Sequence, residues 1–595
     1  PLVEDMTEDR LLEVLEEALS ARIIEEMPQA IARYQFTHAL IQETLAGELT
    51  MTRKVRLHAQ IAEALEVLYG GDSEAHAAEL AHHFAEAEAV LGPDKLVRYS
   101  LLAGEKALAS YAWEEAQNHF ARGLAARSIS IAESDPLLDA EAAALTFGLG
   151  RARVATADQG QMQEAVNSLA RVFDYYFETG DKANALAVAE FPVPMANRRT
   201  GMTQILGKAL TLVSPGSLPE GRLLSHYGWE LARVEGDYAA AQAAFNRALA
   251  IARDAGDANL ELSTLTRSAD VDLFQLRLAE SSTKSLESIE LAVRAGDTYE
   301  EASARLTASR ALILRGEGVE AQTQASALLA LGERVGNRHW LGMGTALALH
   351  QNSQLACLKG DWSQGRDLAE EALALAPQDP LVLSRLAILE YETGNFSQGE
   401  AYLERLLKIM ALAPPSPRAA YFYPAMAIPY AARVSGVSFR LSEAAEAAQI
   451  ILSAPSVTPL YTVVARCGLG LQAIIQGDAP AAAEQYVDLE IVQGILLPRD
   501  IAGDRVLALL SQTIGELDQA AVHFEDSLRF CIKAGYRPEL AWSCCDYADT
   551  LLQRNNPGDR EKAMSLLDES LATSTELGMR PLMERVLSRR EILKA

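Results

Sequence analysis

Apolar residues recur every three to four positions along most of the chain, which is the spacing of one face of an amphipathic helix. Residues 223–255 show two such runs, with apolar positions at Tyr227, Leu231, Val234, Ala240, Ala244, Leu249 and Ala252. Gly236-Asp237 separates the runs. Glycine tolerates the left-handed conformation that ends one helix, and aspartate caps the next. The segment therefore predicts a helical hairpin.

The same turn recurs along the chain as a glycine, an acidic or amide residue, and then an alanine-rich helix. It is found at Gly180-Asp181, Gly236-Asp237, Gly316-Glu317, Gly360-Asp361, Gly394-Asn395, Gly477-Asp478 and Gly515-Glu516. With looser turns at residues 111–113, 276–279, 440–442 and 557–559, the spacing is roughly 34 to 46 residues, in the range of helical-hairpin repeats. One hairpin cannot bury its apolar face alone, so neighbours must stack. We expect an all-α, superhelical array of hairpins.

These units resemble tetratricopeptide repeats over roughly residues 95–585. The resemblance rests on residues that follow the turns, namely Tyr238 with Ala241 and Phe245, Trp362 with Ala369 and Ala372, and Ala520 with Phe524. The period is longer and looser than the usual 34 residues. The resemblance implies that the first helix of each hairpin lines a concave face, which binds a protein, a peptide or a small-molecule inducer.

The first 60 or so residues follow a different pattern. Residues 11–23 predict an amphipathic helix, residues 31–36 a short strand, and residues 37–40 and 53–58 the starts of two more helices. This order resembles the tail of a winged-helix domain. We therefore expect residues 1–58 to end a winged-helix domain, residues 59–130 to form a helical linker and first hairpin, and residues 131–595 to form the repeat array.

Three groups of segments carry a wider resemblance. Residues 34–43 (YQFTHALIQE) precede residues 56–62 (RLHAQIA), residues 78–84 (AELAHHF) precede 99–107 (YSLLAGEKA), and residues 535–542 (GYRPELAW) precede 546–548 (DYA) and 576–579 (ELGM). Together they are similar to the C-terminal half of large bacterial signalling ATPases, which include LuxR-type regulators and proteins with a class III adenylate cyclase domain. The resemblance implies a sensor arm whose partners include its own upstream NTPase domain. Because the sequence begins at Pro1, we expect a piece of a longer protein.

Composition narrows the class of partner. The 595 residues carry a formal net charge of -28, so we expect no direct binding to nucleic acid, whose phosphates would be repelled. The sequence shows no apolar run of about 20 residues and no signal peptide, so we expect no membrane contact. The five cysteines are scattered, which is typical of buried thiols in a reducing compartment. We expect a cytoplasmic protein.

Motifs for chemistry are weak, and we expect no catalytic, cofactor or metal site. Residues 201–209 have one residue too many for a phosphate loop and lack its Ser/Thr. His82 and His83 are adjacent, so on a helix they are predicted to point about 100° apart and not to chelate together. Ser281 and Lys284 fit a Ser-x-x-Lys pattern that is interpreted as a helix start. The basic residues near the end are interpreted as cations at a helix C-terminus, with a phosphate contact as the alternative; they are Arg585, Arg589, Arg590 and Lys594.

Two segments are candidates for contact with a ligand or partner. One is an uncharged polar stretch in a first helix, with His350, Asn352 and Gln354, for which a solvated face is the simpler explanation. His350 and Gln354 are one turn apart and share a face. The other is an aromatic group at Tyr421, Tyr423 and Tyr430 beside Pro424 and Pro429, which are expected to break a helix. These aromatics form a recognition pocket or fill a gap in irregular stacking.

The leading hypothesis is thus a non-catalytic repeat domain for signal transduction or transcription regulation. Two alternatives stay open. The chain is a fragment of an ATP-hydrolysing or adenylate cyclase enzyme whose catalytic domains lie upstream, or it is a free-standing assembly scaffold.

Overall fold

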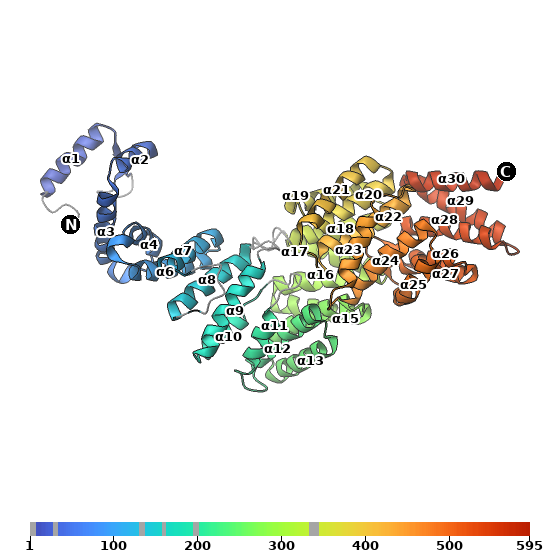
Figure 1. Cartoon of the computed structure of the whole chain (residues 1–595), viewed down its shortest axis with the longest axis horizontal. Helices are drawn as coiled ribbons and strands as arrows, with labels where there is room; N and C mark the ends of the chain where they lie inside the picture. Colours follow the sequence, from blue (N-terminus) through green and yellow to red (C-terminus); the bar gives the residue numbers. More distant parts are fainter. Residues whose placement is uncertain are drawn as a thin grey trace. The chain divides into compact units, whose positions relative to one another are not determined.

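The computed structural model describes residues 7–27, 34–129, 137, 139–156, 162–193, 201–332 and 344–594. The chain divides into two compact units, Pro1–Leu212 and Val213–Ala595. Apart from two short strand pairs, the regular elements of the described residues are helices (Figure 1), which confirms the all-α class. None of these helices is long and apolar enough to cross a membrane.

The first unit contains one strand pair and eleven α-helices within its described residues. The elements are α1 (Glu8–Ser20), β1 (Ile24–Glu26), β2 (Tyr34–Phe36), α2 (Ala39–Gly47), α3 (Met51–Tyr69), α4 (Ala77–Glu86), α5 (Glu88–Leu91), α6 (Asp94–Ala109), α7 (Trp113–Ala126), α8 (Ala140–Thr156), α9 (Met162–Glu178), α10 (Lys182–Ala189) and α11 (Met202–Leu210). Strands β1 and β2 pair antiparallel. The predicted strand over residues 31–36 covers 34–36, and residues 31–33 lie outside the described residues. The winged-helix assignment of residues 1–58 stays a prediction.

Helices α3, α4 and α6 form a small core of their own in the first unit. Ala62 of α3, Leu80 and Phe84 of α4, and Tyr99 of α6 are all buried together. The rings of Phe84 and Tyr99 stack with centroids 5.5 Å apart. This core fixes the faces that α3 and α4 present to each other.

The second unit is a continuous run of helical hairpins, coloured green to red in Figure 1. Its elements are α12 (Leu218–Glu230), α13 (Tyr238–Ala255), α14 (Ala258–Phe274), α15 (Leu278–Ala295), α16 (Thr298–Leu314), α17 (Gly318–Gly332), α18 (Thr345–Lys359), α19 (Trp362–Leu375), α20 (Pro380–Thr393), α21 (Phe396–Leu412), α22 (Ala419–Ser435), α23 (Leu441–Leu452), α24 (Pro459–Gln476), α25 (Ala479–Leu489), β3 (Leu496–Leu497), β4 (Ile501–Ala502), α26 (Gly503–Ile514), α27 (Leu517–Ala534), α28 (Arg537–Arg554), α29 (Asp559–Leu577) and α30 (Arg580–Lys594). Each even-numbered helix from α12 to α26 starts a hairpin and also contacts the next even-numbered helix, for example α20, α22, α24 and α26 in turn. The even-numbered helices therefore form one continuous face.

The turns behave as the sequence predicts. Gly236 ends its helical run in the left-handed conformation with φ 79°, and the side chain of Asp237 accepts a hydrogen bond from the Ala240 N–H at 2.9 Å. Gly256 and Asp257 repeat the arrangement between α13 and α14. The glycine turn and the aspartate cap thus set each hairpin boundary locally.

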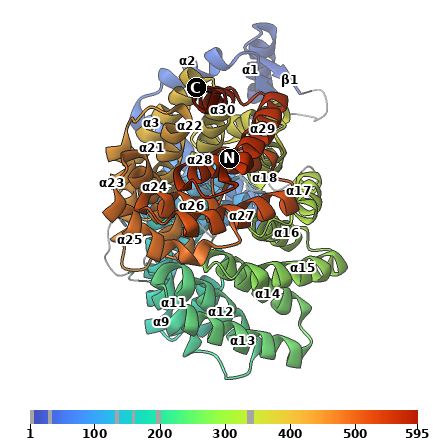
Figure 2. The same cartoon turned by 90° about the vertical axis from the view of Figure 1, so that its right-hand side faces the viewer.

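The second unit winds back on itself, so hairpins far apart in sequence touch. Helix α18 contacts α28, and α20 contacts α30; Figure 2 shows α28 close to α18. The indole of Trp362 donates to the carbonyl of Leu577 at 2.8 Å, and the hydroxyl of Tyr536 donates to the carbonyl of Ile313 at 2.9 Å. Later hairpins therefore cover the face that earlier even-numbered helices would otherwise expose to solvent.

A short β-hairpin, β3–β4, is inserted between α25 and α26 and was not predicted from sequence. Its strands pair Leu496 with Ala502 and Leu497 with Ile501, and all four residues are buried. The turn between the strands places Arg499 and Asp500 at φ 75° and 65°. Non-glycine residues adopt this region at an energetic cost, so the surrounding contacts must hold the tip in place.

Candidate binding sites within the second unit

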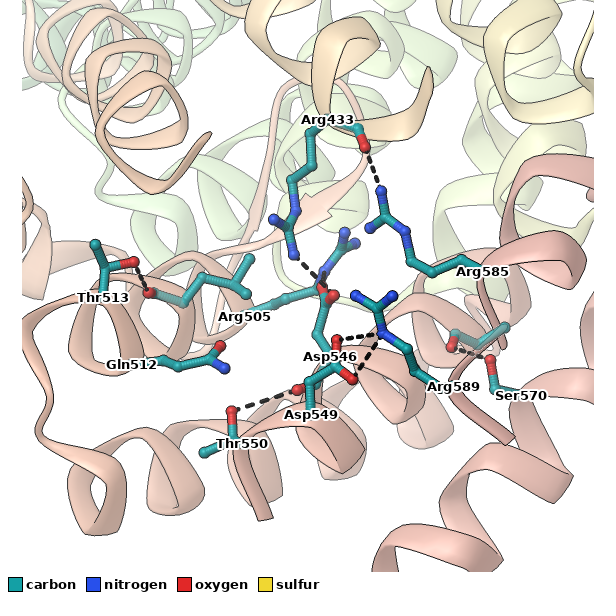
Figure 3. Close-up of polar contacts among 12 residues, drawn as sticks. Arg433, Arg505, Gln512, Thr513, Asp546, Asp549, Thr550, Ser570, Arg585 and Arg589 are labelled. Carbon is teal, nitrogen blue, oxygen red and sulfur yellow. Dashed lines mark hydrogen bonds and ion pairs between the residues drawn. The ribbon is translucent and has the colours of Figure 1, made fainter. Parts of the chain in front are cut away.

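A wide groove opens between even-numbered helices of the last hairpins. It has a volume of about 840 Å³ and draws its lining from α22, α24, α26, α28 and α30, among other segments. Its charged and amide side chains are Arg433, Gln512, Asp546, Asp549, Gln553, Glu584, Arg585 and Arg589. Figure 3 shows how most of these side chains lie. The lining is polar, with apolar patches from Ile474, Ile475 and Leu509.

Asp546 is held between arginines at the wall of the groove. Arg433 Nη2 lies 2.7 Å from Asp546 Oδ1, and Arg505 Nε lies 3.0 Å from Oδ2 (Figure 3). Burial acts to raise the pKa of Asp546, but Arg433, Arg505 and Arg585 outweigh it and lower the pKa to about 2. Asp546 is therefore a fixed negative charge that is already paired.

Arg585 has a different environment from its neighbours in the groove. Arg589 pairs with Asp549 at 3.1 Å, whereas Arg585 donates to the backbone carbonyl of Arg433 at 2.6 Å and lies 4.9 Å from the ring centroid of Trp542. Burial, followed by the proximity of Arg433, lowers the pKa of Arg585. Within the described residues Arg585 forms no ion pair with a carboxylate. Arg585 is therefore a cation in the groove that can donate hydrogen bonds to the carboxylate of a ligand.

A second, smaller cavity of about 60 Å³ lies deeper, where α14, α16, α18, α20, α22, α24 and the β3–β4 turn meet. His350, Gln351 and Gln354 line it from α18, together with Tyr423 of α22. His350 is 1% exposed, and its Nδ1 has no hydrogen-bond partner among the described residues. Burial, and then Arg385 and Arg499, lower the pKa of His350 well below its usual range, so its ring is neutral at pH 7.

Two arginines face this inner cavity. Arg499 is 4% exposed, donates to the hydroxyl of Ser384, and lies 4.9 Å from the ring centroid of Tyr423. Burial, with Arg385 next, lowers the pKa of Arg499 to about 10, which leaves it charged at neutral pH. In the part of the chain that the structure describes, neither Arg499 nor Arg310 forms an ion pair. Asp500 and Asp379 act on Arg499 only electrostatically, without an ion pair in the described residues. A buried cation without an ion-pair partner is costly, so this cavity favours an anion.

The residues singled out in the sequence fall into two groups. His350, Gln354 and Tyr423 come together in the inner cavity. Asn352 instead faces α17, where it donates to the Ala325 carbonyl at 2.9 Å. The remaining two hydroxyls also bond elsewhere, Tyr421 to the Ala413 carbonyl and Tyr430 to Glu392 Oε1.

All six of these side chains are buried, so a solvated face does not explain the polar stretch on α18. The expectation that Pro424 and Pro429 break a helix is also wrong, because both lie inside the continuous helix α22. That helix is packed against α20, α23 and α24, and this packing outweighs the loss of two N–H donors.

Sequence reasoning missed Arg433, Arg310 and Arg499 and the buried hairpin that carries Arg499. It did single out Arg585 and Arg589, but as cations at a helix C-terminus, whereas in the structure both line the groove, where they bond to the Arg433 carbonyl and to Asp549. It also misjudged a histidine pair. The structure brings His82 and His83 together with His58, so that one ligand atom from each lies within 4.8 Å of the others. The expected divergence of about 100° therefore does not keep the ligand atoms of His82 and His83 apart.

The stacked hairpins and their shared even-numbered face define a tetratricopeptide-like helical-repeat protein. A tetratricopeptide repeat family model matches residues 358–417, which span α19 to α21. No curated protein matches the chain in sequence.

Among solved structures, the APC/C hetero-tetramer Cut9–Hcn1 contains a chain that is similar at 14% identity and a TM-score of 0.42, over 92% of this chain and 98% of that one. A Rap protein complexed with competence and sporulation factor is similar at 10% identity and a TM-score of 0.35, over 76% and 99% of the two chains.

Proposed function

We propose that the second unit binds an extended, carboxylate-bearing peptide segment of a protein partner in the groove between α22 and α30. The observation that carries this proposal is Arg585, a groove cation that contacts a carbonyl and an aromatic ring. Asp546 acts on it electrostatically, but within the described residues no carboxylate forms an ion pair with it. The groove volume of about 840 Å³ lies within the range of roughly 300–1,000 Å³ typical of ligand sites. Helical arrays commonly use such extended inner surfaces for binding.

The lining of the groove suits a peptide chain more than a compact apolar ligand. Gln512, Thr513 and Gln553 offer amide and hydroxyl groups to the backbone of an extended segment. Arg585 supplies a charge-assisted hydrogen bond to one carboxylate of the ligand. Asp546 and Asp549, already paired with arginines, keep those arginines from competing for the same carboxylate.

The experiment selects a display library of random peptides against the purified chain, with counter-selection against Arg585→Glu. Selected peptides are synthesised, and their affinities are measured by fluorescence anisotropy for the wild type, Arg585→Ala and Arg529→Ala. Arg529 is the matched control, since it is an exposed arginine of α27 that does not line the groove.

The expected peptides are enriched in Asp and Glu, and Arg585→Ala weakens their binding by roughly 10- to 100-fold, because a hydrogen bond to a charged group is worth about 1.5–3 kcal/mol. Arg529→Ala binds as the wild type does. Selected peptides that bind both variants equally well would show that the groove is not the binding site.

We infer a wider setting from the resemblance to bacterial signalling ATPases: a cytoplasmic sensor arm attached to an upstream NTPase domain, in a signal-transducing or transcription-regulating protein. Support comes from the three groups of segments that carry the resemblance, at residues 34–62, 78–107 and 535–579. Sequencing the reading frame upstream of Pro1 tests it. A phosphate loop and a Mg²⁺-binding acid in frame support the sensor arm, whereas a start codon directly before Pro1 leaves the scaffold alternative.

A second candidate function is the capture of a small oxyanion, such as the carboxylate or phosphate of an inducer, in the inner cavity. The specific observation is that Arg310 and Arg499 face one cavity beside His350, whose Nδ1 lacks a partner within the described residues. A water needs about 10–15 Å³ of such volume, so 60 Å³ holds roughly four waters or one small anionic group.

Inorganic phosphate and sulfate are the probes for this site. Each is titrated while the midpoint of thermal unfolding is followed for the wild type, Arg310→Gln and Arg305→Gln. Arg305 is the control, because it lies on the same helix but is paired with Glu301. A saturable stabilisation that Arg310→Gln alone removes supports the site, and an equal response of all three proteins contradicts it.

A further inference from the structure

Three histidines converge where α3 meets α4 in the first unit. His58 Nδ1 lies 2.9 Å from His83 Nδ1, and one ring nitrogen from each of His58, His82 and His83 lies within 4.8 Å of the others. The ring centroids form a near-equilateral triangle, with His58 5.7 Å from His82 and 5.0 Å from His83, and His82 5.2 Å from His83.

The packing of the two helices explains how neighbours in sequence can point to one place. The side chains of successive helix residues point about 100° apart, so His82 and His83 leave a space between them. The buried core of Ala62, Leu80 and Phe84 holds α3 against α4. His58 of α3 therefore enters this space from the opposite helix, and the three rings lie at the corners of one triangle.

We propose that His58, His82 and His83 bind one divalent metal ion of the zinc type, with solvent at the fourth position. Zinc binds imidazole nitrogen at about 2.0–2.1 Å in a tetrahedral arrangement, which places two ligand nitrogens roughly 3.3 Å apart. The His58–His83 pair is already near this separation, and a ligand atom of His82 lies within 4.8 Å of the other two. His82 is exposed, so water can reach the open position.

The charges around the cluster favour a cation. Glu86 interacts electrostatically with all three histidines, and Glu79 with His83. Lys54 opposes them, but it pairs with Glu86 at 2.9 Å. Carboxylates close to the ligands commonly orient metal-binding imidazoles.

An imidazole ring binds a metal in its neutral form. Without a metal, the two facing Nδ1 atoms must adopt opposite tautomers to share one proton.

The experiment uses the whole chain without an affinity tag, treated with a chelator and then dialysed. Co²⁺ is titrated as a spectroscopic probe of coordination, and Zn²⁺ is then added in competition. The variants are His58→Gln, His83→Gln and His82→Gln, with His38→Asn as the control. His38 is an exposed histidine at the N-cap of α2, where Asn also caps well. Circular dichroism verifies that each variant keeps its helices.

The expected result is one Co²⁺ per chain with a tetrahedral visible spectrum, displaced by Zn²⁺. Affinity falls by at least about tenfold in each of the three variants, as even outer-shell losses cost about 10–100-fold, and is unchanged in His38→Asn. Binding that persists in His83→Gln and His58→Gln, or an octahedral spectrum in the wild type, overturns the proposal.

Discussion

Gly468 of α24 lies directly against the carbonyl oxygen of Ala425 in α22. A Cβ built on Gly468 would be 2.0 Å from that oxygen. Pro429, four residues after Ala425, has no N–H to donate to the same carbonyl. The missing side chain at Gly468 thus lets α24 approach α22 closely at the point where α22 lacks a helical hydrogen bond.

We expect Gly468→Ala to destabilise the second unit by at least about 1–3 kcal/mol, since the clash is with backbone and cannot be relieved by rotating a side chain. Gly470→Ala is the matched control on the same helix. Its Cβ would meet Leu510 at 3.4 Å, an ordinary contact, and alanine is favoured over glycine within a helix by about 0.5–1 kcal/mol. Urea unfolding followed by circular dichroism should move the two midpoints in opposite directions, and parallel shifts would contradict this account.

The cysteines give a prediction about reactivity. All five are buried, and burial raises the pKa of the Cys357 thiol to about 12 and also raises that of the other four thiols. Because the thiolate is the reactive form, we expect almost no reaction of the native chain with a chromogenic disulfide reagent at pH 8. The denatured chain should release five equivalents. A fast-reacting thiol in the native chain would show that one of these sites opens readily.

Much of the fold could be predicted, because short local sequence signals determine where each helix begins and ends. Glycine turns and aspartate caps such as Gly236-Asp237 act within a few residues, and alanine spacing marks the packed faces. The inward winding of the second unit could not be predicted in this way. It depends on contacts such as that between Trp362 and Leu577, which are 215 residues apart in sequence.

The candidate sites were harder to predict for the same reason. His350 and Gln354 were recognised as sharing a face, and they do line one cavity. The arginines that give this cavity its charge come from α16 and from a turn between two-residue strands. No periodicity marks Arg499, and the convergence of His58 with His83 depends on how α3 packs against α4.

Asp500, at the tip of the inserted hairpin, compensates a buried cation. Both guanidinium amines of Arg385 bond to it, and it accepts a hydrogen bond from Gln354 at 2.8 Å. Arg385 is 1% exposed. Removing one partner of a buried pair costs about 3–5 kcal/mol, so we expect Asp500→Ala to destabilise the chain by about that amount.

Asp488→Ala is the control for this prediction. Asp488 pairs with Arg466 at 2.8 Å with nearly half of its side chain exposed, and exposed pairs contribute about 0–1 kcal/mol. Chemical unfolding compares the two variants. Equal, small losses would show that the hairpin tip does not stabilise the array.

Glu539 gives a prediction on pH. It is buried beside Arg505 and accepts a hydrogen bond from the Ala502 N–H at 2.8 Å. Burial raises the pKa of Glu539 from 4.5 to about 7, although Arg505 acts in the opposite direction. The folded chain therefore holds a proton here that the unfolded chain has already released, and this contribution to stability falls as pH rises from about 4.5 to about 7.

Gln at position 539 resembles the protonated acid and cannot ionise. We therefore expect the stability of Glu539→Gln, relative to the wild type, to increase as pH rises through that window and to level off above it. Urea unfolding at several pH values measures the difference, and Glu561→Gln, which changes an exposed Glu of α29, should show no comparable trend. A relative stability that falls with pH would mean that the ion pair with Arg505 outweighs burial.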